Sequence, residues 1–371
     1  MTLTARHFRT GESIALTIVD GVITNIEPSE RPATNLWIAP SFFDVQINGC
    51  LGIGFNSPTL NPDGVRIVAN KCRQHGIGRF CPTVITDSFE SIRNGFEVLT
   101  EARNADAELA WRLPAFHLEG PYLSELDGPR GAHPKAHIRD PNWDEFRRWQ
   151  DAAAGCIRMT TIAPERAGAL RYIERLTAEG VVVALGHTAA TASQIRAAVT
   201  AGARISTHLG NGYFAQMPRH DNVIWEQLAN DGLWASLIAD GHHLPPAVVK
   251  SLVRAKTPSR ILLTCDASTL AGLPPGRYAD WGAELEVLPG GKVVIPGTPY
   301  LAGSGLFTDT CVTNVVRMAG VTLADAIDMA SIRPRQLMGL PVPDLAVGAK
   351  AEFVLFDRED CGDIVVKKTM G

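Results

Sequence analysis

The 371-residue sequence lacks the marks of several classes of protein. None of its apolar runs approaches the ~20 residues needed to cross a bilayer, and its first residues, MTLTARHFRTGES, do not include the apolar core of a secretory signal. It has seven cysteines, an odd number, and no Cys-x-x-Cys pair, which argues against a disulfide framework and favours reduced thiols. These absences predict a soluble, cytoplasmic protein.

The sequence also has little net charge and no repeats. A formal net charge of -4 gives no electrostatic reason to expect a nucleic acid or an acidic membrane as partner. No internal repeat of about 20–50 residues is present, which argues against a solenoid. The dinucleotide-binding pattern Gly-x-Gly-x-x-Gly is also missing, because NGCLGIGFN has another spacing. What is present is an ordinary globular balance of 45% hydrophobic and 20% charged residues, enough to bury a large core.

Short strand-like segments occur at both ends of the chain. SIALTIVD and VITNIEPS are joined by Asp20-Gly21, a signal for a two-residue hairpin turn. The C-terminal segments AEFVLFD and DIVVKK have the same short-strand character. We therefore expect one small β-sandwich domain built from residues 1–40 and 345–371.

Between these ends, apolar runs alternate with helical patterns such as SFESIRNGFEVLTEARNA, ERAGALRYIERLTAEG, ATASQIRAAVTAG and PPAVVKSLVRAK. Near-continuous apolar strands that alternate with helices are typical of a parallel sheet covered by helices, and eight such units favour a closed (β/α)8 TIM barrel of the α/β class. We expect the barrel over residues 41–344, with LEVLPGGKVVI as an inserted hairpin and closing helices near FTDTCVTNVVRMAG and TLADAIDMASIRPRQLMG. The eight runs are LWIAPSFFDVQING, IGRFCPTVIT, RLPAFHLEGP, CIRMTTIAP, GVVVALGHT, ARISTHLG, WASLIADGHH and RILLTCDA.

Four of these runs end in residues that suit catalysis: Glu119, His187, His208 and Asp266. The C-terminal ends of barrel strands are where enzymes of this fold build their active sites. One carboxylate and two imidazoles form a plausible open zinc site that leaves a fourth position for water, and a nearby aspartate could move protons. A lone histidine in a strand is more often structural, and Asp266 could instead cap a helix or end a loop. Glu119 favours the metal site, because a carboxylate that ends an apolar strand is costly to bury unpaired.

Other ionisable residues lie near these positions. His117 precedes Glu119 by two residues and therefore faces the same side of its strand. It could be a ligand, a residue that orients Glu119, or part of the barrel filling, and we favour the orienting role. Loop residues form a further set that could hold an anionic group such as phosphate, although single loop charges are usually just solvated. That set is Arg130, His133, Arg219, His242 and His243.

The order of these motifs resembles the N-acetylglucosamine-6-phosphate deacetylase family of the amidohydrolase superfamily. The resemblance runs from APSFFDVQING to VGAKAEFVLFD and includes HLEGPYL, PRGAH, TIAPE, GHT, STHL, ADGHH, TCDA and YLAGS. Any one of these is weak, but together they are specific. The family's architecture is a (β/α)8 barrel with a small β-sandwich from both termini.

The resemblance implies one divalent metal ion, most often zinc and sometimes iron, held by Glu119, His187 and His208. A metal-bound hydroxide would attack the acetyl group of N-acetylglucosamine 6-phosphate, with Asp266 as general base and then general acid. His133 would polarise the acetyl carbonyl. The resemblance also implies a homodimer whose partner subunit lends part of the phosphate site. The substrate-contacting positions would be Ala132, His133, Asn211, Gly212, Arg219, Asp240, His243, Leu301, Ala302 and Gly303.

Two stretches depart from the superfamily pattern. Gln46-Ile47-Asn48 stands where many amidohydrolases carry His-x-His for a second metal ion, and neutral amides are weak zinc ligands. We therefore expect a single metal, with Gln46 and Asn48 in an outer layer around it. The loop THLGNGYFAQMPRHDN is longer than the family's usual form between His208 and Met217-Pro218. This loop keeps two alternatives open: another N-acyl amino sugar, such as N-acetylgalactosamine 6-phosphate or an unphosphorylated sugar, or a non-catalytic sugar-phosphate sensor.

Overall fold

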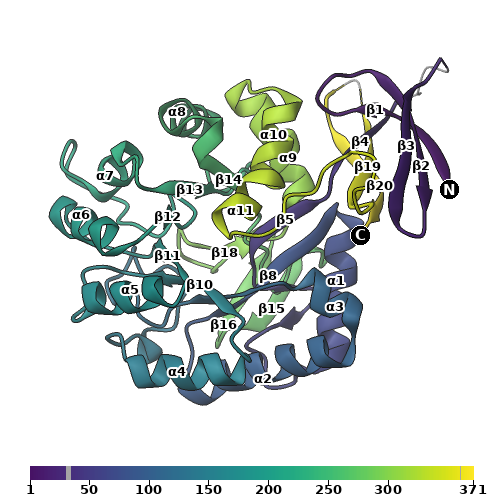
Figure 1. Cartoon of the computed structure of the whole chain (residues 1–371). Helices are drawn as coiled ribbons and strands as arrows, with labels where there is room; N and C mark the ends of the chain where they lie inside the picture. The colour runs from purple at the N-terminus through teal and green to yellow at the C-terminus, as the bar shows by residue number, and fades with distance from the viewer. Residues whose placement is uncertain (31–34, 360) are drawn as a thin grey trace.

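The computed structural model of the chain describes residues 1–30, 35–359 and 361–371. Residues 31–34 and 360, which belong to the predicted small domain, lie outside the described residues. Strands from both chain ends form one continuous sheet beside the main body, at the upper right of Figure 1. Its order is β20 (Ile364–Met370), β19 (Phe353–Arg358), β4 (Leu36–Pro40), β1 (Thr2–His7), β2 (Ser13–Val19) and β3 (Val22–Pro28).

The turn between β2 and β3 shows how the local sequence directs this sheet. Asp20 and Gly21 both have positive φ angles, of 49° and 76°. Positive φ at both central residues matches the right-handed twist of paired strands, and Asp-Gly adopts it readily. The hairpin predicted here is confirmed. The sheet has its own apolar cluster, which includes Leu16, Ile38 and Phe353.

The main body is the predicted barrel. An eight-stranded parallel sheet runs in chain order, and a parallel bridge between Ile47 and Ala267 joins its first strand to the segment that follows its last strand. All eight apolar runs supply a strand. The first run supplies two, because its start forms β4 in the terminal sheet and only its second half enters the barrel. The barrel strands are β5 (Phe42–Ile47), β8 (Ile77–Ile85), β9 (Phe116–Glu119), β10 (Ile157–Ile162), β11 (Val182–Leu185), β12 (Ile205–Ser206), β13 (Trp234–Leu237) and β14 (Ile261–Leu263).

Helices surround the barrel as an outer layer (Figure 1). The four helical patterns quoted above form α2, α5, α6 and α8. The predicted last helix is two helices, because the chain leaves helical geometry at Ser331, where φ is -128° and ψ is -60°. No helix in the described ranges is both long and apolar enough to cross a membrane. The helices are α1 (Pro62–Gln74), α2 (Phe89–Ala105), α3 (Ala107–Arg112), α4 (Trp143–Ala152), α5 (Ala169–Ala178), α6 (Ala192–Ala201), α7 (Val223–Ala229), α8 (Pro246–Lys256), α9 (Thr308–Ala319), α10 (Leu323–Ala330) and α11 (Ile332–Leu337).

The barrel interior is filled in layers, as the two-residue period of its strands requires. One apolar layer contains Phe43, Cys81, Met159 and Leu262. Closer to the C-terminal ends of the strands, the buried side chains in the barrel are polar. Thr161 lies two residues beyond Met159 on β10, and His117 of the neighbouring strand β9 contacts it. The next inward-facing position on β9 is Glu119. The alternation of side chains along β9 therefore places a carboxylate at the open, C-terminal end of the barrel.

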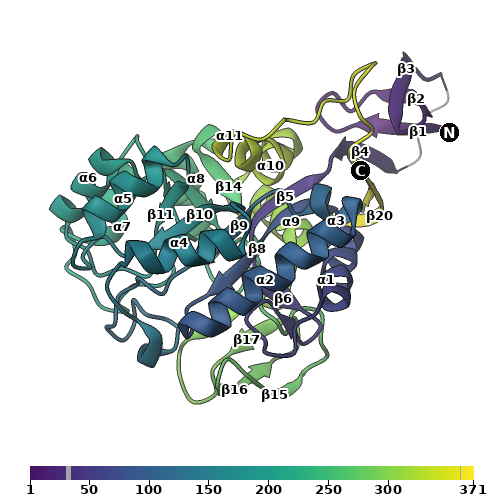
Figure 2. The same ribbon diagram turned by 60° about the horizontal axis from the view of Figure 1, so that its bottom comes forward.

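A four-stranded antiparallel sheet is inserted between β14 and α9, and the predicted hairpin is its centre. Figure 2 shows this insertion at the bottom of the view, away from the terminal sheet. Its last strand runs beside the segment that follows β14, since Ala267 and Ser304 form a parallel bridge. The insertion is thereby fixed to the segment that carries Asp266. Its strands are β15 (Gly276–Asp280), β16 (Ala283–Val287), β17 (Lys292–Val294) and β18 (Leu301–Ser304), and a separate two-stranded piece follows β5 as β6 (Gly49–Cys50) and β7 (Ile53–Gly54).

Candidate metal centre and substrate pocket

The four residues singled out at strand ends meet at the C-terminal mouth of the barrel. Glu119 ends β9, and His187, His208 and Asp266 follow β11, β12 and β14. The three that follow strands have positive φ angles of 49°, 31° and 50°. Left-handed backbone is costly for residues other than glycine, and such strain gathers at functional sites. The backbone therefore bends sharply after three strands to aim these side chains into one space.

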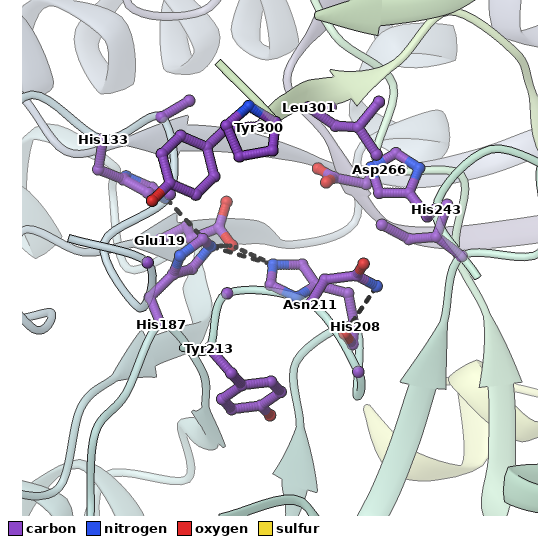
Figure 3. A pocket seen from close by; sticks show the side chains of 18 of the residues that line it. Glu119, His133, His187, His208, Asn211, Tyr213, His243, Asp266, Tyr300 and Leu301 are labelled. Atoms are coloured by element: carbon purple, nitrogen blue, oxygen red, sulfur yellow. Dashed lines mark hydrogen bonds and ion pairs between the residues drawn. The ribbon is translucent and has the colours of Figure 1, made fainter. Parts of the chain in front are cut away.

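Three side-chain atoms at this mouth form a closed triangle (Figure 3). The Nε2 atom of His208 lies 3.3 Å from Oε1 of Glu119 and 3.1 Å from Nε2 of His187, and the third side is 3.5 Å. A tetrahedral ion with bonds of about 2.0–2.1 Å holds its ligand atoms about 3.3–3.4 Å apart. The triangle thus has the size and the carboxylate–imidazole chemistry of three sites around one zinc-sized ion.

A third histidine, His133, could compete for the same ion. His133 places Nε2 at 3.2 Å from Nε2 of His187, and Glu119, His133 and His187 also form a buried group with metal-ligand spacing. His208 fits better as the third ligand, because its nitrogen closes the triangle to both other atoms. His133 lies beside that triangle, with its Nδ1 atom 2.9 Å from Oγ1 of Thr86.

Burial and mutual contacts set the charges in the site. Burial opposes the ionisation of Glu119, but hydrogen bonds from His187 and His208 outweigh it and hold the pKa of this carboxyl well below its usual range. Burial lowers the pKa of His133 to about 3, and the neighbouring His187 adds to this effect. His133 is therefore a neutral imidazole that can donate one hydrogen bond.

Asp266 has the opposite environment. Burial raises its pKa to about 8, and the nearby negative charge of Glu119 contributes in the same direction. Its Oδ1 atom accepts hydrogen bonds from Nε2 of Gln46 at 2.9 Å and Nδ2 of Asn48 at 2.7 Å. The same nitrogen of Gln46 donates to Glu119 at 2.9 Å. A carboxyl group with a raised pKa, held beside a metal-ligand triangle, is suited to accept and return a proton near neutral pH.

The backbone of β5 explains how Gln46 reaches this position. The register between β5 and β8 shifts between Asp44 and Ile47, which marks a β-bulge. Bulges re-aim side chains next to active sites. His117, by contrast, makes its hydrogen bonds to other residues than Glu119. Its ring nitrogens lie 2.8 Å from Oγ1 of Thr161 and 3.1 Å from the carbonyl oxygen of Val45, so it belongs to the barrel filling beneath the site. Gln46 makes the contact with Glu119 that we expected from His117.

A pocket of about 340 Å³ opens over the four residues. It is the cavity drawn in Figure 3. Seven of the predicted substrate-contacting residues line it: Ala132, His133, Asn211, Gly212, His243, Leu301 and Gly303.

Three predicted substrate contacts lie elsewhere. Asp240 is buried behind His243, and its Oδ2 atom accepts hydrogen bonds from Nδ1 of His243 at 2.8 Å and from Oγ of Ser304 at 2.9 Å. Burial opposes the ionisation of Asp240, but hydrogen bonds from the side chain of His243 and from the backbone N–H groups of His242 and His243 outweigh it and hold the pKa below its usual range. Ala302 is packed in the apolar cluster of the insertion. Arg219 is exposed and does not line the pocket, although its sequence position places it in the same loop as Asn211.

Several residues of the site were not identified from the sequence. The pocket wall includes Tyr213, Met217, Trp281 and Tyr300, and Thr86 contacts His133 from the end of β8. Thr86 follows an apolar run at the same end of the barrel as Glu119, and that position is the signal that could have found it. The four wall residues come from loops and from the insertion. Their position at the pocket depends on the conformation of these loops, which the hydrophobic periodicity of the sequence does not predict.

Comparison with known proteins gives consistent relatives. The chain is 35% identical over 349 residues to the N-acetylgalactosamine-6-phosphate deacetylase of Escherichia coli O157:H7, covering 92% of this chain and 90% of that protein. It is 36% identical over 339 residues to the human N-acetylglucosamine-6-phosphate deacetylase, covering 86% and 79%. No family model matches the chain.

Solved structures agree with these relatives. The N-acetyl-D-glucosamine-6-phosphate deacetylase of Mycobacterium smegmatis superposes with a TM-score of 0.88 at 31% identity, covering 100% of this chain and 98% of that one. The 5-methylcytosine deaminase of Klebsiella pneumoniae has the same fold, with a TM-score of 0.57 at 13% identity and coverage of 99% and 94%.

Proposed function

Because the chain belongs to the N-acetylglucosamine-6-phosphate deacetylase family of the amidohydrolase superfamily, we propose that it hydrolyses the acetamido group of N-acetylglucosamine 6-phosphate to give glucosamine 6-phosphate and acetate. The observation that carries this proposal is the closed triangle of Glu119, His187 and His208 beside Asp266, at the floor of a pocket of sugar size. A single divalent ion would be held by these three residues. Zinc is the first candidate and iron the second, since carboxylate and imidazole suit both.

The side chains take distinct parts in the reaction. When bound, the metal supplies a Lewis acid and lowers the pKa of water. Asp266, held by the amides of Gln46 and Asn48, accepts the proton of the attacking water and returns it to the departing amine. His133 polarises the acetyl carbonyl by donating from Nε2. This direction requires Thr86 to donate to Nδ1, which the 2.9 Å contact allows.

The other end of the pocket suits the phosphate. His243 lines it and is oriented by Asp240, while Asn211 and Gly212 come from the loop after β12. No lysine or arginine is among the described residues that line the pocket. We therefore propose a homodimer in which Arg219 of one subunit completes the phosphate site of the other. Ala132, Leu301 and Gly303 would contact the sugar.

A second substrate is favoured by one observation. The relative that matches over 92% of this chain acts on N-acetylgalactosamine 6-phosphate, at the same 35% identity as the bovine N-acetylglucosamine-6-phosphate deacetylase. The two sugars differ only in the configuration of one hydroxyl, so the same catalytic residues would serve both. A cytoplasmic location and a division into a barrel of residues 41–344 and a terminal domain of residues 1–40 and 345–371 complete the proposal.

The test is acetate release by zinc-loaded protein from each sugar phosphate and from unphosphorylated N-acetylglucosamine at equal concentrations. We expect one of the two phosphorylated sugars to have the highest kcat/KM and the free sugar to be poor. Equal rates with the free sugar would contradict the phosphate site. Tight binding of the sugar phosphates without acetate release would show a sensor instead of an enzyme.

A further inference from the structure

Glu165 is an ionisable residue that the proposed reaction does not use. It lies three residues beyond the end of β10, in the TIAPE segment, and it does not line the substrate pocket. Its carboxylate reaches the turn after β11 instead. Oε1 accepts a hydrogen bond from the backbone N–H of Ala189 at 2.7 Å, and Oε2 accepts one from the hydroxyl of Thr188. These two residues directly follow His187, so the carboxylate holds the chain beside a proposed metal ligand.

Thr188 extends this contact further along the turn. The residue is fully buried, and its Oγ1 atom also accepts a hydrogen bond from the backbone N–H of Ala190 at 3.0 Å. A hydroxyl group can donate one hydrogen bond and accept two, so both contacts are made at once. Glu165 therefore fixes, directly or through Thr188, three consecutive residues of the turn.

The backbone of His187 needs such support. Its φ angle is 49°, a left-handed conformation that residues with a side chain adopt only where the surrounding contacts impose it. The preceding Gly186 is tightly packed, since a Cβ atom there would lie 2.7 Å from Cβ of Thr207 and 2.9 Å from Cγ2 of Thr161. The carbonyl oxygen of His187 accepts a hydrogen bond from the backbone N–H of Ser124 at 3.0 Å. The chain is thus confined before the strained residue, and the contacts after it decide where it lies.

The imidazole ring of His187 has little freedom of its own. Its Nδ1 atom lies 2.9 Å from the carbonyl oxygen of Pro129, which can only accept, so Nδ1 carries the proton and Nε2 is free to bind a metal ion. Two glycines enclose the ring: a Cβ atom would lie 3.1 Å from Cε1 on Gly131 and 2.9 Å from Nδ1 on Gly212. Because the ring is held in this way, the position of Nε2 depends on the backbone of the turn.

The other two proposed ligands are held by different contacts. Glu119 is the last residue of β9 and belongs to the barrel sheet. The backbone N–H of His208 donates to Oγ of Ser236 in the neighbouring β13 at 2.7 Å. Among these three ligands, His187 is the one whose turn a loop carboxylate holds. A change at that carboxylate should therefore displace one ligand and leave two in place.

We propose that Glu165 is a positioning residue of the metal centre: its carboxylate keeps the turn after β11 in the conformation that aims Nε2 of His187 at the ion. The inference deepens the proposed function and rests on it, since it concerns the same metal site. Glu165 contacts the residues that follow His187 and does not line the pocket, so it acts through His187.

The test measures the zinc affinity of the full chain by competition with a chromophoric chelator, without substrate. Glu165→Ala removes both acceptors, and we expect the dissociation constant for zinc to rise by about 10–100-fold, as is typical when a residue that supports a metal ligand is lost. Glu165→Gln keeps one oxygen for the N–H of Ala189, and its amide nitrogen can donate to Oγ1 of Thr188. Its dissociation constant should therefore stay within about fivefold of the unmodified protein.

Asp140→Ala is the matched control. Asp140 is half exposed and pairs with Arg166, the residue next to Glu165, at 2.8 Å. The control removes a carboxylate from the same side of the barrel mouth without touching the turn that carries His187. We expect it to leave the zinc affinity unchanged within about twofold.

Kinetics at saturating zinc separate positioning from a general loss of stability. With N-acetylglucosamine 6-phosphate, we expect Glu165→Ala to lower kcat by about tenfold or more, because a displaced ligand misplaces the ion. KM should stay within about twofold, since Glu165 does not line the pocket. A purely structural role would lower Tm and leave the zinc affinity and kcat of the folded protein unchanged.

A second variant keeps the test decisive if Glu165→Ala does not fold. Thr188→Val replaces the hydroxyl by a methyl group of similar size, which removes the contact with Glu165 and the one with Ala190. We expect it to raise the dissociation constant for zinc by about fivefold or more, the size of one lost hydrogen bond.

The outcomes distinguish this inference from the proposed function. Unchanged zinc affinity in a folded Glu165→Ala or Thr188→Val protein would overturn the positioning role and leave the deacetylase intact. Equal losses for Glu165→Gln and Glu165→Ala would overturn the account based on hydrogen bonds. Zinc binding without acetate release by the unmodified protein would overturn the proposed function, while the zinc affinities of the variants would still decide on Glu165.

Discussion

The chemistry proposed for Asp266 conflicts with the stability of the folded protein. Its carboxyl group is buried near Glu119, and two amide donors, from Gln46 and Asn48, hold it on one oxygen. Burial that raises an acid's pKa favours the protonated form in the folded state, so ionisation works against folding. The same property makes the group able to take a proton near neutral pH. The residue is expected to lower stability and to raise activity.

The first prediction concerns Asp266→Asn. Without metal, the ordinary pKa of about 3.9 in the unfolded chain lies below the folded value of about 8. The folded state therefore binds more protons between these pH values, and the unmodified protein loses stability as the pH rises from about 4 to 8. The variant, which cannot ionise there, should have the higher Tm at pH 8 and a similar Tm near pH 4 in chelator-treated samples.

Activity should move the other way. With metal added back, Asp266→Asn should retain bound zinc, measured by atomic absorption, and lose about three orders of magnitude in kcat, as expected for removal of a general base. An active variant would refute the proton-transfer role of Asp266. A Tm difference that does not depend on pH would refute the account of its stability.

The predicted site residues that the structure brings together are those that strand periodicity places. Glu119 lies two residues beyond His117 on β9, and both face the barrel interior because side chains alternate along a strand. The chemistry of the position could therefore be predicted from the order of residues alone. Trp281 could not, because nothing in its neighbourhood indicates that the β15–β16 turn reaches the barrel mouth. Arg219 shows the converse, since a charged residue in the right loop lies outside the pocket.

At the scale of elements, the seam between the first and last barrel strands depends on side chains. Among the described residues, one bridge closes the barrel, between Ile47 of β5 and Ala267 in the segment that follows β14, in place of a full ladder between the two strands. Asp44 of β5 spans the gap: its carboxylate accepts hydrogen bonds from Oγ1 of Thr264, from the backbone N–H of Cys265 and from Oγ1 of Thr308 in α9. One buried carboxylate thus joins β5, the end of β14 and the start of α9.

The second prediction follows from this seam. Asp44→Ala removes the acceptor of the Thr308 hydroxyl and of the backbone N–H groups of Cys265 and Gln46, whereas the Thr264 hydroxyl can still donate to the carbonyl oxygen of Gln46. Each buried donor left unpaired costs about 1–3 kcal/mol, so the free energy of unfolding should fall by at least about 3 kcal/mol. Urea denaturation measures it. The exposed Asp63→Ala is the control and should change stability by about 0.5 kcal/mol or less. A loss no larger than that of the control would mean that the seam does not rely on Asp44.

The sequence predicted the type and order of the helices and strands better than the residues at which they begin and end. Long apolar strands and amphipathic helices were predictable because burial repeats along them. We missed the joint between α10 and α11, although Pro334 signals it: proline has no N–H to donate to the carbonyl oxygen of Ala330, and it disfavours helical geometry in the residue before it. A tertiary contact adds to the break, since the hydroxyl of Ser331 donates to the carbonyl oxygen of Ser41 at 2.7 Å.

At the scale of the whole molecule, a buried ion pair joins the barrel to the terminal sheet. Arg335 of α11 is fully buried and donates to the carboxylate of Glu352, which immediately precedes β19, and to the carbonyl oxygen of Ser41 between β4 and β5. Buried charges of this kind must be satisfied together, because either one alone is left uncompensated. The two chain ends are therefore held to the barrel by a contact that depends on both partners.

The third prediction is a double-variant test of that contact. Arg335→Met should lower the free energy of unfolding by about 3–5 kcal/mol, because the Glu352 carboxylate is left buried without its partner. Adding Glu352→Leu should recover a large part of the loss. Chemical denaturation of the two single variants and the double variant gives the coupling energy. Additive losses would mean that the two side chains act independently.

The attachment of the inserted sheet has a consequence for how this protein can diversify. The insertion leaves the barrel after β14 and returns along the same segment, where Ala267 and Ser304 pair, so its two ends are neighbours in space. A module whose ends meet can be lengthened, shortened or exchanged without disturbing the strands on which the barrel folds. Natural drift and laboratory recombination should therefore find new substrate preferences most readily between these two points, while Glu119, His187, His208 and Asp266 stay unchanged.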